Sequence, residues 1–404
     1  MTRSPSVRPF YRPMRPRLRD EPHRSATPLE LFFDLCFVVA VAQAAGNLHH
    51  DVSEGHLGHA VISYLMVFFA IWWSWMNFTW FASAYDTDDD VYRITTLVQI
   101  AGALIIAAGV PRAFTEGDFT VITYGYVVMR LAAVVHWSRA AAGDPEHRSA
   151  ARRYAIGVTV VQVGWLLRLA LPDEWGIASF VLLALADLLV PAVAERPGMT
   201  PWHPRHITER YGLFTLIVLG EAVLSVSLAI QTGLDAGAHG LWSLAAAGAV
   251  IVFALWWLYF DQPVEAPDRL PYSLFWGYGH YLIFAAVAAV GAGLVVTADH
   301  ERHTAHISGV TAGYAVAVPI AVYLLTIWVL HVRLHQRGAV VVAFPVVALL
   351  ALLAPLGPAP VPVLALLLFA LVTLTVLLRR RDVLPTSTPA DADPARSRRR
   401  DRPA

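Results

Sequence analysis

Twelve stretches of mostly apolar residues, each about 20 residues long, follow one another through this 404-residue chain. A helix needs about 20 such residues to cross the hydrocarbon core of a bilayer, about 30 Å thick, because each residue adds about 1.5 Å. The chain therefore predicts an all-α fold, a polytopic transmembrane helix bundle with about 12 spans. The last two stretches are separated by prolines and could instead form a re-entrant hairpin. The stretches are 30–48, 60–84, 94–110, 120–139, 154–171, 176–194, 209–230, 241–260, 273–297, 308–331, 339–355 and 361–378.

The composition agrees with a membrane protein and excludes several other classes. Hydrophobic residues make up 57% and charged residues 15% of the chain, against about 45–50% and about 25% in soluble domains. The 30 acidic residues balance 30 basic ones, all of which are arginine, so neither a nucleic-acid-binding protein nor an acidic solvating chain is expected. Cys36 is the single cysteine, which excludes a disulfide scaffold and a cysteine-based zinc site. We expect the lipid bilayer as the main partner.

Arginine placement predicts which side of the membrane each loop faces, because cytoplasmic loops are enriched in basic residues. If both termini lie inside, the inner segments hold 26 arginines and the outer loops hold two, Arg112 and Arg302. Residues 1–29 and 379–404 carry 15 of the 26 and little apolar sequence, which predicts two disordered basic cytoplasmic arms. We therefore expect a multi-pass protein of the cell membrane with both termini in the cytoplasm.

Features of the first half recur in the same order in the second half. Acidic residues open the first and seventh spans, at Glu30 and Glu209, and aromatic residues follow each of them. A tryptophan pair comes in the next span, at 72–73 and again at 256–257. The pattern predicts two six-helix repeats that share one orientation, although such features also arise independently in aromatic-rich membrane proteins. The predicted units are 30–194 and 209–378, joined by a cytoplasmic linker at 195–208.

Two of these segments carry a family resemblance. The run TPLELFFDLCFV at 27–38 resembles the opening signature of the bacterial low temperature requirement A (LtrA) family, and ERYGLFTLIVLGE at 209–221 resembles its second signature. The resemblance extends from about residue 24 to about residue 380. Cys36 departs from it, at a position where a plain aliphatic residue is expected. What the resemblance implies is an integral membrane protein linked to growth in the cold, with no agreed substrate or mechanism.

An ionisable group inside a span is a candidate for function, because it costs about 2.5–3.5 kcal/mol at the centre of an inserted helix. Glu221 lies twelve residues into the seventh predicted span, about 18 Å along the helix and near the bilayer midplane. We expect Glu221 either to bind a proton or cation or to form a structural hydrogen bond with a neighbouring helix. Gln43 lies at a comparable depth in the first span and is its expected counterpart.

Acidic residues at the helix starts form a second set of candidates. Glu30 and Asp34 are spaced i, i+4, so they share one face at the cytoplasmic mouth of the first span. A favourable interaction with the helix dipole explains Glu30 and Glu209 without any function. Asp34 is one turn deeper and needs a partner, which makes it a candidate ion site. His280, between glycines in the ninth span, is either a proton relay with Glu221 or a packing group.

Two further groups have both a structural and a functional interpretation. Arg130 and Asp187 lie near mid-span and form either a buried ion pair or, if the guanidinium is free, an anion site. Histidines and carboxylates gather in the first and fifth outer loops, which is the chemistry of zinc or nickel ligands, although solvated polar loops are the simpler interpretation. The histidines at i, i+3 spacing in these loops are His56, His59, His303 and His306.

These features favour a secondary transporter or channel-like protein over an enzyme. The expected path for a small ion or solute is lined by Asp34, Gln43, Glu221 and His280. The alternative is a membrane sensor or scaffold that supports growth in the cold, with basic arms that dock on anionic lipid head groups. The chain contains no lysine and therefore no Walker-type phosphate loop. It shows no nucleophile–base motif, so we expect no enzymatic activity and no cofactor.

Overall fold

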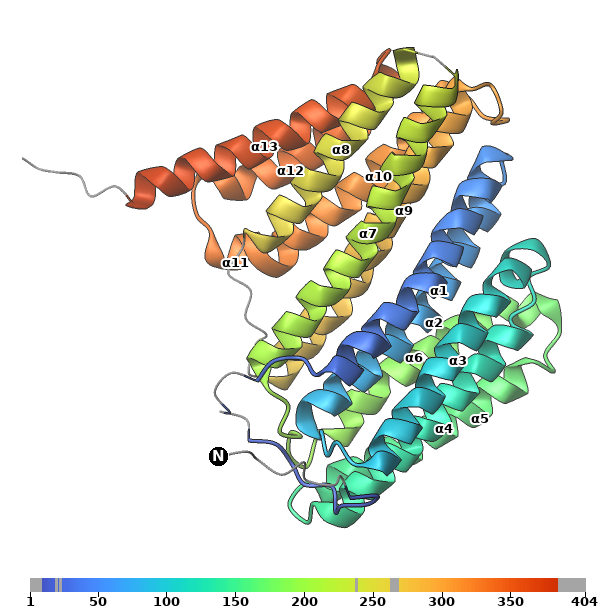
Figure 1. Ribbon diagram of the computed structural model, residues 1–404, viewed down its shortest axis with the longest axis vertical. Coiled ribbons are helices and arrows are strands. Elements are labelled where there is room, and N and C mark those ends of the chain that lie inside the picture. Colours follow the sequence, from blue (N-terminus) through green and yellow to red (C-terminus); the bar gives the residue numbers. More distant parts are fainter. Residues whose placement is uncertain (1–8, 19–20, 22–23, 237–238, 262–268, 384–404) are drawn as a thin grey trace, which may run out of the picture.

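The computed structural model describes residues 9–18, 21, 24–236, 239–261 and 269–383, and within these residues every regular element is a helix (Figure 1). The all-α prediction is confirmed. The first half contains α1 (Pro28–Ser53), α2 (Leu57–Ala84), α3 (Asp90–Thr115), α4 (Thr120–Gly143), α5 (Arg148–Arg168) and α6 (Gly176–Ala194). The second half contains α7 (Pro204–Ala236), α8 (His239–Phe260), α9 (Leu270–Glu301), α10 (Gly309–Ile327), α11 (Arg333–His335), α12 (Ala339–Leu353) and α13 (Pro360–Val383). Short 3-10 turns lie at Asp173–Trp175 and Ala354–Leu356, and a π-helical turn lies at Trp328–Val332.

Eleven helices in the described residues are long and apolar enough to cross a membrane. The predicted span that is missing from these eleven is the fifth, which forms α5; its hydropathy is too low because arginines stand in its first two turns and at its end. Its outward side chains between them are apolar, with Ile156 and Val160 each 64% exposed, and it packs between α4 and α6. The last two predicted stretches are separate candidate spans, formed by α12 and α13.

The order of helix pairing is similar in the two halves, with one difference: α8 packs closely on α13, and α2 and α6 have no comparable contact. In the first half, α1 packs on α2 and α3, α3 on α4, α4 on α5, and α5 on α6. In the second half, α7 packs on α8 and α9, α9 on α10, α10 on α12, and α12 on α13. This recurrence is what two six-helix repeats would produce, and the duplication itself remains a prediction.

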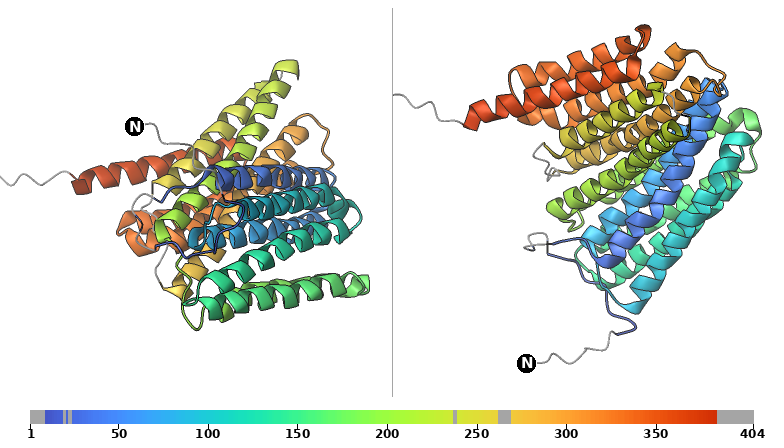
Figure 2. Two further views of the ribbon diagram at one scale, coloured as in Figure 1. Left: turned by 60° about the horizontal axis from the view of Figure 1, so that its bottom comes forward. Right: turned by 45° about the horizontal axis from the view of Figure 1, so that its top comes forward.

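The two halves lie side by side and meet mainly through α1 and α2 on one side and α7 and α9 on the other (Figure 2). Aromatic rings fill this interface. The ring of Trp75 in α2 stacks on that of Phe214 in α7 with centroids 4.2 Å apart, and Phe37 of α1 lies 6.5 Å from the same ring. Such pairs contribute about 0.5–1.5 kcal/mol each beyond their burial. Helix α9 is the central helix, since 83% of its most apolar 18-residue segment is buried inside the molecule.

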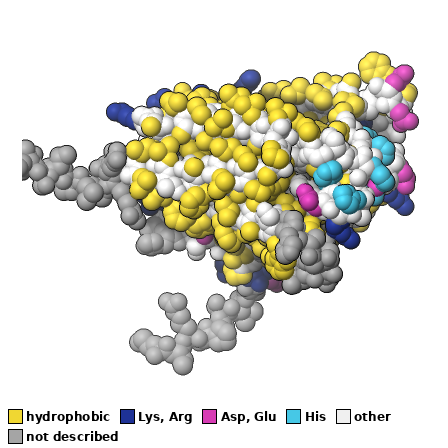
Figure 3. All heavy atoms as spheres, turned by 90° about the horizontal axis from the view of Figure 1, so that it is seen from above, with side chains coloured by type: hydrophobic (Ala, Val, Ile, Leu, Met, Phe, Trp, Pro, Cys, Tyr) yellow, Lys and Arg dark blue, Asp and Glu magenta, His cyan; other side chains and the backbone are white. Residues whose placement is uncertain are grey.

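The outer surface agrees with a lipid-facing belt. On the face shown in Figure 3, hydrophobic side chains form a broad band, and charged and histidine side chains gather toward its ends. Leu182 and Leu366 are each 68% exposed and Phe253 is 66% exposed. Large apolar patches of this kind are rare on soluble monomers, whereas a bilayer covers them.

The described part of the amino-terminal arm, which the sequence predicts to be disordered, contacts the rest of the molecule. Residues 9–18 run across the ends of α2, α3 and α4 (Figure 1). Met14 is fully buried, and the backbone N–H of Arg12 donates to Asp89 at 2.7 Å. The backbone N–H of Arg17 donates to the carbonyl of Ala84 at 2.9 Å. The carboxyl-terminal residues 384–404 lie outside the described residues.

Candidate functional site

The site begins with the way helix α1 starts. Thr27 is its N-cap, with Pro28 in the first turn, and the Thr27 hydroxyl accepts from the backbone N–H of Glu30 at 3.3 Å. The Glu30 carboxylate in turn accepts from the backbone N–H of Thr27 at 2.7 Å. This capping box satisfies two backbone donors that no helical hydrogen bond reaches. It also fixes the side chain of Glu30, so that one carboxylate oxygen remains free to face the interior.

Asp34, one turn deeper, pairs with an arginine from the other half of the molecule. Arg210 of α7 donates from Nε to one Asp34 oxygen at 2.9 Å and from Nη2 to the other at 2.5 Å. The indole N–H of Trp75 also donates to Asp34 at 2.7 Å. Asp34 is 1% exposed and Arg210 is fully buried. A two-pronged arginine–carboxylate pair of this kind is both strong and geometrically specific.

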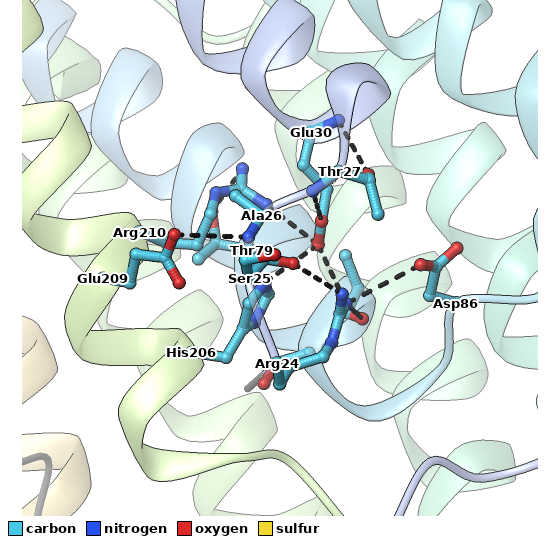
Figure 4. A network of polar contacts seen from close by, with 12 residues as sticks. Arg24, Ser25, Ala26, Thr27, Glu30, Thr79, Asp86, His206, Glu209 and Arg210 are labelled. Carbon is cyan, nitrogen blue, oxygen red and sulfur yellow. Dashed lines mark hydrogen bonds and ion pairs between the residues drawn. The ribbon is translucent and has the colours of Figure 1, made fainter. Parts of the chain in front are cut away.

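Glu30 completes a charge cluster around the same arginine (Figure 4). One of its oxygens lies 3.2 Å from Nη1 of Arg210 and 3.3 Å from Nε2 of His206. Nη2 of Arg24 donates to that oxygen at 3.3 Å. In the described part of the chain, Nη1 of Arg210 and both ring nitrogens of His206 have no partner with hydrogen-bond geometry. These buried nitrogens therefore interact with Glu30 mainly through electrostatic attraction and not through directed hydrogen bonds.

The cluster brings carboxylates and guanidinium groups together. Glu30, Asp34 and Asp86 supply the carboxylates, Arg24 and Arg210 supply guanidinium groups, and Arg17 lies 3.4 Å from Asp86 at the edge of the cluster. Asp86 lies in the loop between α2 and α3, 3.8 Å from Arg24. Burial, together with the nearby charge of Glu30, raises the pKa of Asp86 to about 6, against the opposing effect of Arg24 and Arg17. One proton can therefore enter or leave this group of charges near neutral pH.

Glu221, the leading candidate from the sequence, lies away from the cluster. Its side chain is half-buried, and no described residue forms an ion pair or a side-chain hydrogen bond with its carboxylate. Gln43 is exposed on α1. Glu209 is exposed as well, and its carboxylate accepts from the backbone N–H of Ala26 at 3.3 Å. The structure thus brings Glu30 and Asp34 together and leaves these three outside that group.

His280 contacts another histidine, and Glu221 is not among its contacts. Its ring centroid is 5.5 Å from that of His331, which lies in the π-helical turn. Nδ1 of His280 donates to the carbonyl of Trp276 at 2.8 Å, and Nε2 lies 3.2 Å from the hydroxyl of Tyr259. Glu221 lies farther along α7, where the neighbouring residue Ala222 packs against Gly291 of α9. The ring centroid of Tyr211 lies 4.9 Å from that of His280. Glu221 is ten positions farther along α7 than Tyr211, which corresponds to about 15 Å of helix.

Arg130 and Asp187 form the buried ion pair that is one of the two interpretations of these residues. Nη2 of Arg130 donates to Asp187 at 2.6 Å. The hydroxyl of Tyr126 and the indole N–H of Trp165 donate to the same carboxylate at 2.7 Å and 2.9 Å. All of these residues come from α4, α5 and α6, so the pair lies within the first half. Arg168, at the far end of α5, donates to the carbonyl of Gly176 at 2.9 Å.

Two of the four histidines that the sequence offers as weak metal ligands contact a carboxylate or a carbonyl. His306 lies 3.1 Å from Glu54, and His59 lies 2.5 Å from the carbonyl of Phe114. His56 and His303 are both exposed loop residues. Among the residues that the structure describes, no group of three or more His, Cys, Asp or Glu side chains could hold a metal ion.

The residues that sequence reasoning missed are the cations of the cluster. Arg210 counts as a loop residue if the seventh span begins at Glu209, but α7 begins at Pro204, so Arg210 lies about 9 Å inside the helix. Arg24 falls in the arm that the sequence predicts to be disordered, yet its side chain is only 3% exposed. One sequence signal could have indicated the pair: the second signature carries a basic residue, Arg210, near its start, and the first signature carries two acidic residues, Glu30 and Asp34.

The pair of Asp34 with Arg210 brings the two signature segments together in space. Comparison with known proteins supports the family resemblance of these segments. Residues 25–378 match the family described as bacterial low temperature requirement A protein (LtrA). The chain belongs to the LtrA family. Five residues of the cluster lie within the matched range, whereas Arg24 precedes it; the five are Glu30, Asp34, Asp86, His206 and Arg210.

A curated relative of this LtrA chain is the uncharacterized protein RA0937 of Rhizobium meliloti (strain 1021). It is 26% identical over 253 residues, which cover 59% of this chain and 59% of the relative. The chain thus spans about six tenths of the length of the relative that it matches. That relative supplies no activity or substrate, so a function must be argued from the site.

Proposed function

We propose that this LtrA-family protein is a secondary transporter whose two halves are held in one arrangement by the pair of Asp34 with Arg210. Protonation of Asp34 releases Arg210, and the halves then move relative to each other. The observation that carries the proposal is that the cation and the carboxylates come from opposite halves. The coupling ion is accordingly a proton, and the solute is a small ion or molecule.

The energetics of a buried ion pair support this role. Breaking such a pair by neutralising one partner costs about 3–5 kcal/mol, because it leaves an uncompensated buried charge. When the pair lies across an interface, part of that cost can be relieved if the interface opens and water reaches the arginine. Protonation of one carboxylate therefore favours a second arrangement of the halves, which is how a local charge change biases a two-state element.

A pair of distance measurements tests the proposal. The full-length chain carries Cys36→Ala together with Leu104→Cys in α3 and Leu349→Cys in α12, both at exposed positions, and is spin-labelled in nanodiscs. Asp34→Asn imitates the protonated carboxyl and should add a second distance population, which the parent chain should also show at low pH. Asp187→Asn is the matched control, because it neutralises a buried carboxylate within one half and should leave the distance unchanged. An unchanged distance in Asp34→Asn at every pH would overturn the proposal.

A specific observation favours the alternative, a membrane sensor or scaffold. Transport needs a polar cavity at the site, whereas a cavity of about 540 Å³ formed by described residues is apolar. It lies between the ends of α1 and α2 and helices α9 and α10, and Glu221 does not line it. If a scaffold is correct, Asp34→Asn should only lower stability, with no second distance population. The same experiment therefore decides between the two functions.

A further inference from the structure

We infer that the amino-terminal segment, residues 9–18, 21 and 24–27, is a strap that closes one end of the charge cluster and regulates access to it. The inference rests on the proposed function for its biological meaning, but the closure itself can be tested without transport. Residues 9–24 precede the range that matches the LtrA family. The part of the strap before residue 25 is therefore not covered by the family assignment, whereas residues 25–27 lie inside the matched range.

Contacts on both halves hold the strap in place. On the first half, the backbone N–H of Arg17 donates to the carbonyl of Ala84. On the side of the linker and the second half, the His203 ring lies 3.1 Å from the carbonyl of Glu21, and the N–H of Ala26 donates to Glu209. A segment bound to both halves restrains any movement of one against the other.

The fit of the strap against α4 is close. Met14 is fully buried, and it lies over Gly143, the last residue of α4. A Cβ atom added at Gly143 would come within 2.1 Å of the Met14 carbonyl oxygen and 2.8 Å of its backbone nitrogen. These atoms belong to the backbone, so a side chain at position 143 must displace the strap. Gly143 is the position where this contact can be broken without changing any charge.

Charge connects the strap to the cluster. Arg24 lies between Glu30, at 3.3 Å, and Asp86, at 3.8 Å (Figure 4). Arg17 also donates to Asp86, at 3.4 Å. The charged groups that act on Asp86 are thus Arg24 and Arg17 from the strap, Glu30 from α1 and Asp88 from its own loop. Neutral Asp86 would bind the two strap arginines less tightly, so acidification loosens the strap.

Thiol labelling inside the cluster measures the closure directly. Thr79 is fully buried and its hydroxyl accepts from Nη2 of Arg210 at 3.4 Å. A Thr79→Cys reporter in a Cys36→Ala background therefore reports access to the cluster by a charged methanethiosulfonate reagent in nanodiscs. We expect Gly143→Ala and Arg24→Gln to label about tenfold faster than the parent, since reaction follows the open population. Asp86→Asn should show a smaller increase in the same direction.

Two matched variants control for general loosening. Gly46→Ala adds a Cβ where nothing lies within 4 Å, and Arg15→Gln removes an exposed arginine of the strap; both should label like the parent. Equal labelling in Gly143→Ala, Arg24→Gln and the parent would overturn the strap, whatever the distance measurements show. Faster labelling in the two control variants as well would also overturn it, because the effect would then not come from the strap contacts.

Discussion

Two buried arginine–aspartate pairs in this molecule have similar chemistry and different surroundings. Asp187 accepts from Arg130, Tyr126 and Trp165, all in the first half. Asp34 accepts from Arg210 of the second half and from Trp75 of the first. The first pair fixes helices that stay together, whereas the second joins bodies that could separate. Burial and hydrogen bonding alone do not distinguish a structural pair from a switch; the difference lies in which elements the pair connects.

Arg210→Gln is expected to show the largest effect on this comparison. It leaves Glu30 and Asp34 buried without their shared cation, so the free energy of unfolding should fall by about 3–5 kcal/mol. Thermal unfolding of the detergent-purified chain measures the loss. The double variant Asp34→Asn/Arg210→Gln should recover part of the stability, and a simple sum of the two single losses would contradict a direct pair.

Arg130→Gln is expected to cost less, about 2–3 kcal/mol, because Asp187 keeps two neutral donors after the arginine is removed. The same thermal measurement gives the loss. The sharper result is the distance between the halves, which should not change, since all of these groups lie in α4, α5 and α6. If Arg130→Gln shifted that distance as Asp34→Asn does, the distinction between the two pairs would fail.

Asp86→Asn should change the pH dependence of stability. The pKa of Asp86 is about 6 in the folded chain and about 3.9 unfolded. The folded state thus binds more protons between these values, and stability falls as pH rises from about 4 to about 6. The carboxylate should cost on the order of 2–3 kcal/mol once ionised. Asp86→Asn should remove this fall in a series of unfolding measurements, and Asp88→Asn, a neighbour on the same loop, should keep it.

Sequence periodicity and composition sufficed for the helices, because a span is a local property of about 20 residues. They also sufficed for the acidic partners, since Glu30 and Asp34 share a face at i, i+4 spacing. The cluster as a whole could not be predicted. Arg210 is 176 positions from Asp34, and only the packing of α7 beside α1 makes them neighbours. Arg24 could not be predicted for the same reason. An arginine-rich segment is expected to be exposed to solvent, unless it is known that a buried carboxylate faces it.

Glu221→Gln should have the smallest effect on stability, within about 0.5 kcal/mol, because no described group pairs with the carboxylate and the side chain is half-buried. Because the effect on stability is small, a change in proton flux in this variant would report on function and not on folding. If Glu221 is a second proton carrier, proteoliposomes with a pH-sensitive dye should show a lower proton flux under an imposed pH gradient, with normal folding. If flux is unchanged while Asp34→Asn abolishes it, proton coupling resides in the cluster between the halves and Glu221 has no part in it.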